Sequence, residues 1–245
     1  MLGAIGELAR VASTFKSPYL SQKNPSELRL AMIERDYIMR MIQMLVQVLA
    51  KILFFKKGGQ YPEALDEIQK ASKQILGIEL EVFRKLSDIQ MIEFLSLDVS
   101  LGIPKCYAAG ILLKEEAEIF AHQKKEPEST DAFVKSLSLL TEVAIHNKAA
   151  IDTDHTKAID SVAGKLQGKD FPVYIRKKLF LYFDIAGQYG MAAGVLSDIL
   201  EEEPSFISEG IGYYERLEKK SDEELLRGGL QRKYVEELLA DLRDR

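Results

Sequence analysis

The sequence predicts an all-α protein, and three observations support this fold class. Apolar residues recur at helical spacing along most of the chain; Tyr189, Ala192, Leu196 and Ile199, for example, lie at i, i+3, i+7 and i+10. Residues that start or stop helices separate such segments, as Pro204 does after this stripe. No segment shows the two-residue alternation of apolar and polar residues that is typical of a half-buried strand.

The composition indicates a soluble globular chain. Its 245 residues are 47% hydrophobic and 29% charged, which is enough apolar content for a sizeable core. The formal net charge is -5, and the basic pairs lie among acidic residues, so a general nucleic-acid binder is not expected. Cys106 is the only cysteine, which excludes an internal disulfide and fits a reducing compartment. The first twenty residues lack a signal-peptide pattern, so we expect a cytoplasmic protein.

The first long helix is predicted to begin at Asn24 and Pro25 and to run to about Phe55. Its second half is apolar except for a narrow stripe at helical period, formed by Asp36, Arg40, Gln43, Gln47 and Lys51. No uninterrupted apolar run approaches the roughly 18 residues that cross a bilayer. We therefore expect a helix that is buried on most sides or, alternatively, one that lies along a membrane surface through Tyr37 to Lys57.

The next segments predict two helix pairs with an interruption between them. The first pair spans residues 37–76. Ser87 to Gln90 forms a capping-box pattern for a short helix, and Gly102 with Pro104 is expected to close the interruption. The second pair spans residues 105–147.

Within this second pair, residues 124–129 are expected to form the turn, and the second helix to start at Thr130 or Asp131. The second helix has an apolar face of Phe133, Leu137, Leu140 and Ala144. Its predecessor carries several carboxylates, which at this spacing are typical of a solvated face: Glu115, Glu116 and Glu118.

The last part of the chain predicts a third pair over residues 172–203, with shorter helices on both sides. The remaining helices are expected at about residues 156–166, after Pro204 to about Lys219, from the Ser221 capping box to Gly228-Gly229, and from Leu230 to Arg243. Several small residues near the third turn indicate a neighbouring helix in close approach, because glycine in a helix costs about 1 kcal/mol relative to alanine. They are Ala186, Gly190, Ala192, Ala193 and Gly194.

Two segments repeat one turn and the helix that follows it, the second copy beginning at Gly187, 128 residues after Gly59. Gly59, Gln60, Tyr61, Ala64, Ile68 and Ala71 match Gly187, Gln188, Tyr189, Ala192, Leu196 and Ile199. Each copy resembles the second helix of a tetratricopeptide unit, with its Gly-x-Tyr-x-x-Ala turn, although Phe180 replaces the usual small residue of the first helix. The resemblance implies stacked antiparallel helix pairs in an irregular array.

Other motifs resemble an uncharacterised bacterial family of helical proteins, catalogued only as a domain of unknown function. The resemblance covers about residues 33–242 and implies no activity. In such proteins the Arg35-Asp36-Tyr37-Ile38 motif lies close to the initiator, so residues 1–31 are expected to be an extension and residues 32–245 a single helical-repeat domain. The other motifs are Leu113 to Ile119, Gly228-Gly229-Leu230 and Tyr234 to Glu237.

No residue pattern predicts a catalytic, cofactor or metal site. Asp152, Asp154 and His155 come nearest to a metal cluster, but their spacing matches no metal loop, and aspartate is favoured at a helix start in any case. A lone cysteine such as Cys106 is usually a small buried hydrophobe. His122 and His146 have no evident partners in the sequence, and we expect them at the surface or between helices.

The sequence therefore favours a non-enzymatic interaction or scaffold protein that holds a protein or peptide partner. Tetratricopeptide geometry, if the resemblance extends to it, would place one face of the helix at 173–186 on a concave surface. The predicted contacts are Tyr174, Lys177, Leu181 and Asp184. Two alternatives remain open, a peripheral membrane protein that uses residues 37–57 and an enzyme with dispersed catalytic residues.

Overall fold

A computed structural model describes residues 25–97, 101–146 and 153–245, and every regular element in these ranges is a helix. The predicted all-α class is therefore confirmed. The chain divides into two compact units, unit 1 (Met1–Lys169) and unit 2 (Asp170–Arg245). Unit 1 contains α2 (Pro25–Lys57), α3 (Tyr61–Leu76), α4 (Leu80–Phe83), α5 (Asp88–Ser96), α6 (Gly102–His122), α7 (Glu126–His146) and α8 (Thr153–Leu166). Unit 2 contains α9 (Val173–Ile185), α10 (Tyr189–Glu202), the short 3-10 helix η3 (Pro204–Phe206), α11 (Ile207–Glu218), α12 (Asp222–Arg227) and α13 (Arg232–Asp244).

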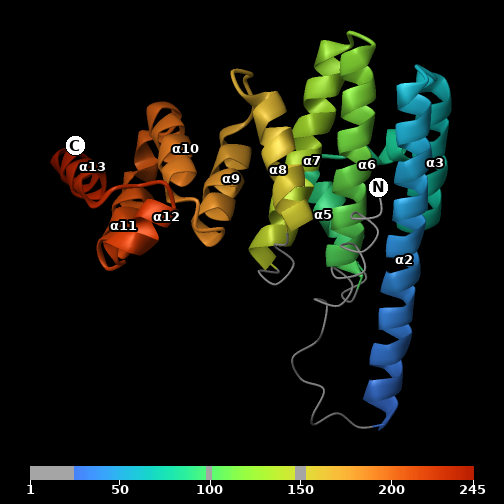
Figure 1. Ribbon diagram of the computed structural model, residues 1–245, viewed down its shortest axis with the longest axis horizontal. Coiled ribbons are helices and arrows are strands. Elements are labelled where there is room, and N and C mark those ends of the chain that lie inside the picture. Colours follow the sequence, from blue (N-terminus) through green and yellow to red (C-terminus); the bar gives the residue numbers. More distant parts are fainter. Residues whose placement is uncertain (1–24, 98–100, 147–152) are drawn as a thin grey trace. The chain divides into compact units, whose positions relative to one another are not determined.

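Unit 1 is built around two helical hairpins, α2–α3 and α6–α7. Figure 1 shows the two helices of each hairpin side by side, and α3 packs against α6 to join the hairpins. Helix α5 packs against both α6 and α7, while α8 packs against α7. The N-terminal part of α2 extends beyond the other helices of the unit (Figure 1).

The predicted apolar stripes form much of the core. Phe133, Leu137, Leu140 and Ala144 of α7 are each at most 2% exposed. Within unit 2, the stripe of α10 that begins at Tyr189 is likewise buried. Helix α10 packs against α9, whose residues Ile175, Leu179 and Phe183 are buried as well. Burial of these side chains is the main favourable term in the stability of the hairpins.

One turn geometry joins the helices of all three predicted pairs. Gly59, Lys124 and Gly187 have φ values of 69°, 61° and 72°, in the left-handed region that ends many helices. The amide of the residue that follows each of them donates to the carbonyl five residues earlier, as in a Schellman motif. These bonds are Gln60 to Phe55 at 2.9 Å, Lys125 to Phe120 at 2.9 Å and Gln188 to Phe183 at 2.8 Å.

In unit 2 the turn before α10 packs against the turn that precedes α13. The amide of Gly190 donates to the carbonyl oxygen of Gly228 over 2.8 Å. A Cβ atom at Gly190 would lie 2.5 Å from the carbonyl oxygen of Gly229, so only glycine allows this approach. The Tyr213 hydroxyl of α11 also donates to the carbonyl oxygen of Tyr189 over 3.0 Å. Two motifs that lie far apart in the sequence therefore meet in one contact.

Several predicted boundaries are wrong. Gly102 and Pro104 do not close a loop but form the first turn of α6, where proline needs no amide partner. Helix α7 begins at Glu126, before the predicted Thr130 or Asp131, because the left-handed conformation of Lys124 reverses the chain in a turn of only three residues after His122. The four-residue helix α4 was not predicted.

The expectation that α2 is buried on most sides is also wrong. One row of its side chains is buried, while Tyr37, Leu53 and Phe54 are more than 40% exposed. The buried row consists of Ile38, Met41, Ile42, Leu45, Val48 and Ile52. Helix α2 is therefore amphipathic, with large apolar side chains outside its buried face as well.

Two glycines of α10 provide a test of this packing. We expect Gly190→Ala to lower the free energy of unfolding by about 1 to 3 kcal/mol, because the new methyl group collides with the Gly229 carbonyl. The matched variant Gly194→Ala should raise it by up to about 1 kcal/mol, because a Cβ atom there meets nothing within 4 Å. Urea unfolding followed by circular dichroism measures both. Equal effects of the two substitutions would contradict the close approach at Gly190.

Candidate functional site

The predicted contact residues of α9 lie on one face of that helix in unit 2. Tyr174 and Leu181 are 41% and 43% exposed. Lys177 and Asp184 lie between and beyond them at helical spacing, so the four side chains form one row. The structure therefore places the predicted residues together, with two apolar members at the surface.

The two charged residues of this row are held by the neighbouring elements. The Lys177 ammonium lies 2.8 Å from the Glu203 carboxylate and 4.7 Å from the centre of the Phe206 ring. The Asp184 carboxylate accepts a hydrogen bond of 2.8 Å from Arg216 of α11. Both charges are thus fixed in position, and the face that α9 offers to a partner is apolar at Tyr174 and Leu181.

A second surface of unit 2, which the sequence analysis did not predict, is a groove of about 290 Å³ between α10 and α13. We call it the α10–α13 groove. Leu196, Leu200 and Leu242 provide its apolar part, and Tyr214 of α11 also lines it. The remaining lining residues are Ala193, Gly194, Ser197, Glu201, Leu238, Asp241 and Arg245. The sequence signal for it was Gly194, which was interpreted only as a site of helix packing within the chain.

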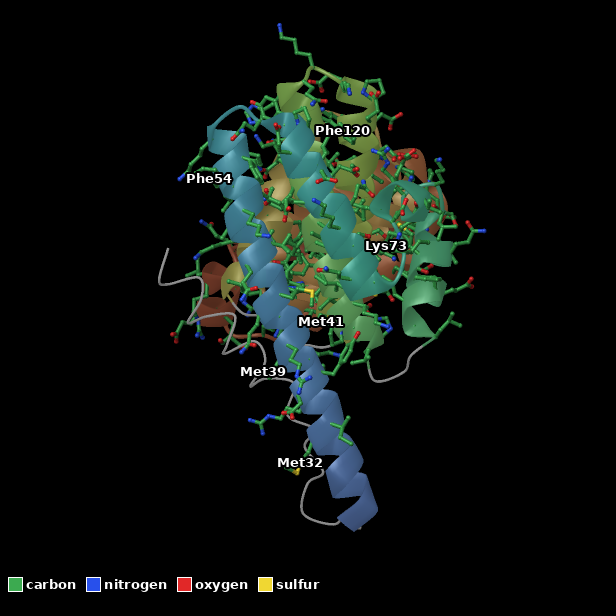
Figure 2. All side chains as sticks on the ribbon, turned by 90° about the vertical axis from the view of Figure 1, so that its right-hand side faces the viewer. Met32, Met39, Met41, Phe54, Lys73 and Phe120 are labelled. Carbon is green, nitrogen blue, oxygen red and sulfur yellow. The ribbon has the colours of Figure 1, made fainter. Side chains whose placement is uncertain are left out.

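The outward surface of α2 carries exposed apolar side chains at several positions between Met32 and Phe54. Figure 2 shows Met32 on the extending part of the helix and Phe54 near its other end, and both side chains are 69% exposed. By length and composition alone, Arg35–Lys57 is sufficiently apolar to cross a membrane, with a mean hydropathy of 1.7 and 28% of it buried. Polar residues such as Arg40, Gln43 and Gln47 interrupt this segment, so it contains no uninterrupted apolar run of 18 residues, and it meets the criterion only through its mean hydropathy.

The glutamates of α6 do not form the predicted solvated face. Lys56 at the end of α2 lies 2.6 Å from Glu115 and 2.5 Å from Glu118, and Lys114 contacts the same two carboxylates at 3.0 and 2.6 Å. Burial opposes charge here, but hydrogen bonds from the two lysines hold the pKa of Glu118 below its usual value. This four-residue ionic cluster fixes the end of α2 on α6.

Glu116 is more deeply buried and has a different environment. It is 2% exposed, and its Oε2 atom lies 3.5 Å from Nη1 of Arg84, without a hydrogen bond to either atom among the described residues. Burial raises the pKa of Glu116 to about 7, although the Arg84 guanidinium acts in the opposite direction. Asp131 and Glu81 raise the pKa further, and Lys135 lowers it.

This environment makes the stability of unit 1 depend on pH. Because the folded-state pKa of Glu116 is above the unfolded value, the stability it contributes is present at low pH and is lost as pH rises from about 4.5 to about 7. We expect Glu116→Gln to gain about 1 to 3 kcal/mol relative to the wild type between pH 5 and pH 8. Urea unfolding at both pH values measures this. Glu128→Gln, at an exposed position of α7, is the control and should show little change; a pH-independent difference for Glu116→Gln would refute the assignment.

The other candidate residues are accounted for by packing. His155 is 2% exposed, with Nε2 2.9 Å from the Leu140 carbonyl oxygen and its ring stacked on Tyr107. Asp152 lies outside the described residues, and no group of three metal-ligating side chains gathers within the described part of the chain. Cys106 is buried, and His122 stacks on Tyr61 of α3.

These features define an all-helical protein that is built of helical hairpins. A model of the family of unknown function DUF6483 matches residues 32–245, so the chain belongs to this family. The match agrees with the predicted resemblance over about residues 33–242 and begins at the residue where the family-like sequence was expected. No curated protein and no solved structure matches the chain.

Proposed function

We propose that this protein is a cytoplasmic, non-enzymatic interaction module that holds a protein partner on the face of α9. The observation that carries the proposal is the pair of exposed apolar side chains, Tyr174 and Leu181, beside charges that Glu203 and Arg216 already fix. An apolar surface that is rigid before binding loses little side-chain entropy when a partner docks.

The repeated turn supports a tetratricopeptide-like arrangement of these hairpins. The turns at Gly59 and Gly187 have the same conformation and hydrogen bonds, and the third hairpin uses the same geometry at Lys124. In arrays of this type the first helix of each pair lines the concave surface, which would be the role of α9. The contact between Phe180 and Tyr213, with ring centres 5.1 Å apart, brings α9 and α11 together in the way that neighbouring first helices would meet.

Capture of partners by the tagged full chain tests the proposal. We expect Leu181→Lys to reduce recovery of a specific partner by about tenfold or more, because it places a charge in the centre of an apolar contact. Met191→Lys is the matched control, since Met191 is a similarly exposed apolar residue of unit 2 on α10. Quantitative mass spectrometry of the captured proteins compares the variants, and thermal unfolding verifies that both remain folded. Equal recovery with the two variants would exclude the α9 face.

The exposed apolar side chains of α2 favour a second candidate, attachment to a membrane surface. Helices that lie in the interface bury one apolar face and keep a polar face in water. Leu53 and Phe54 are available for this, at 44% and 69% exposed, whereas Leu45 is 1% exposed and belongs to the core.

Flotation with vesicles of phosphatidylcholine and phosphatidylglycerol tests this second candidate. Leu53→Glu with Phe54→Glu should abolish co-flotation if α2 provides the contact, because carboxylates are costly to bury in the apolar part of the interface. Leu226→Glu, at a position that is 61% exposed in unit 2, is the control. Absence of wild-type flotation, or flotation of all variants alike, would rule out membrane attachment through α2.

A further inference from the structure

The α10 side of the α10–α13 groove is lined by small residues and leaves space for another group. Ala193, Gly194 and Ser197 line that side, and a Cβ atom built on Gly194 would have no neighbour within 4 Å. Gly190, four residues earlier, is explained by its contact with Gly229, but Gly194 has no such explanation among the described residues. Since glycine is among the least favourable residues inside a helix, its presence here fits the close approach of a second helix from outside the unit.

Tyr214 provides an independent indication that the groove is a binding site. It is 3% exposed and lines the groove, yet its hydroxyl forms no hydrogen bond to any residue that the structure describes. The adjacent Tyr213 shows the usual arrangement, with its hydroxyl donating to the Tyr189 carbonyl oxygen. Burial raises the pKa of Tyr214 to about 12, so the hydroxyl is a neutral donor at physiological pH. A main-chain carbonyl of a bound segment would satisfy it.

The charges around the groove indicate the chemistry of its occupant. Glu201 and Glu202 end α10 and Glu203 follows as its C-cap, at the end of the helix where the dipole disfavours negative charge. Glu202 pairs with Arg176 and Glu203 pairs with Lys177, but Glu201, which lines the groove, has no ion pair within the described residues. On the opposite wall Asp241 is already neutralised by Arg245 at 2.7 Å. A cationic side chain of the bound segment would form an ion pair with Glu201.

We propose that the α10–α13 groove binds an amphipathic helix of a partner protein, with a lysine or arginine of that helix paired to Glu201. The apolar side chains of the helix enter the groove against Leu200 and Leu242, and its backbone passes close to Gly194. The volume of about 290 Å³ accommodates a few side chains, so the groove anchors one or two turns of the helix. This surface is separate from the α9 face and does not depend on its function.

Selection from a displayed library of random peptides of about 16 residues, long enough for four helical turns, tests the proposal. The full chain is the target, and the Gly194→Leu variant is used for counter-selection, because leucine fills the groove without disturbing the fold. Selected peptides should combine apolar residues at helical spacing with at least one lysine or arginine. By fluorescence anisotropy they should lose about tenfold or more in affinity for Gly194→Leu. They should keep their affinity for Gly164→Leu, a matched control at another open helical glycine.

A charge exchange tests the pairing with Glu201 and remains informative if Gly194→Leu is unstable. Glu201→Lys should weaken the basic peptides by about tenfold at low salt, and replacing the peptide lysine by glutamate should restore binding to this variant. Peptides without basic residues, or peptides unaffected by both substitutions, would overturn the proposal. Peptides that instead lose affinity for Leu181→Lys would assign binding to the α9 face. Dimerisation that Gly194→Leu abolishes would make a second copy of the chain the occupant and would equally overturn it.

Discussion

A single residue with left-handed backbone conformation between two helices is the constraint on which the hairpins depend. At Gly59, Lys124 and Gly187 this conformation reverses the chain within three residues and at the same time satisfies carbonyl groups at the end of the first helix. Because so short a turn holds the two helices antiparallel and adjacent, it also determines which apolar stripes of the two helices face each other. The buried faces of α3, α7 and α10 follow from where the turn starts each helix, and the core follows from those faces.

The sequence predicted the turn correctly where glycine occupies the left-handed position. Glycine tolerates a positive φ without strain, so Gly59 and Gly187 predicted two turns and the helices after them correctly. Lys124 adopts the same conformation at a cost of about 1 to 2 kcal/mol, and nothing in its identity indicates it. The predicted start of α7 was late for that reason. Gly102 and Pro104 predicted a loop where a helix begins, because proline is found both in loops and in the first turn of a helix.

The charged residues of α6 show a different limit of sequence analysis. Glu115, Glu116 and Glu118 follow the pattern of a solvated face, and their burial depends on Lys56 and Arg84, which arrive from other helices. The same helix thus contains a fully paired cluster and, one residue away, a carboxylate with an incomplete partner. Hydrogen bonds from two lysines lower the pKa of Glu118, whereas burial without a hydrogen bond raises the pKa of Glu116, so the two sites respond differently to pH. Sequence spacing within α6 carries no information about either partner.

The small residues of α10 were interpreted as a sign of close helix packing, and the structure explains Gly190 in this way but not Gly194. Gly190 and Gly194 lie one turn apart in the same helix, and from sequence both indicate a close neighbour. The structure supplies that neighbour for Gly190, the turn at Gly228 and Gly229, which explains why two separate glycine motifs occur in one chain. It supplies none for Gly194 among the described residues, where the helix instead borders a groove that is lined by Tyr214 and by Glu201, which has no ion pair within those residues. Glycine is unfavourable inside a helix, and nothing in unit 2 requires it at position 194. Its presence is most simply explained if a helix of a partner occupies the α10–α13 groove.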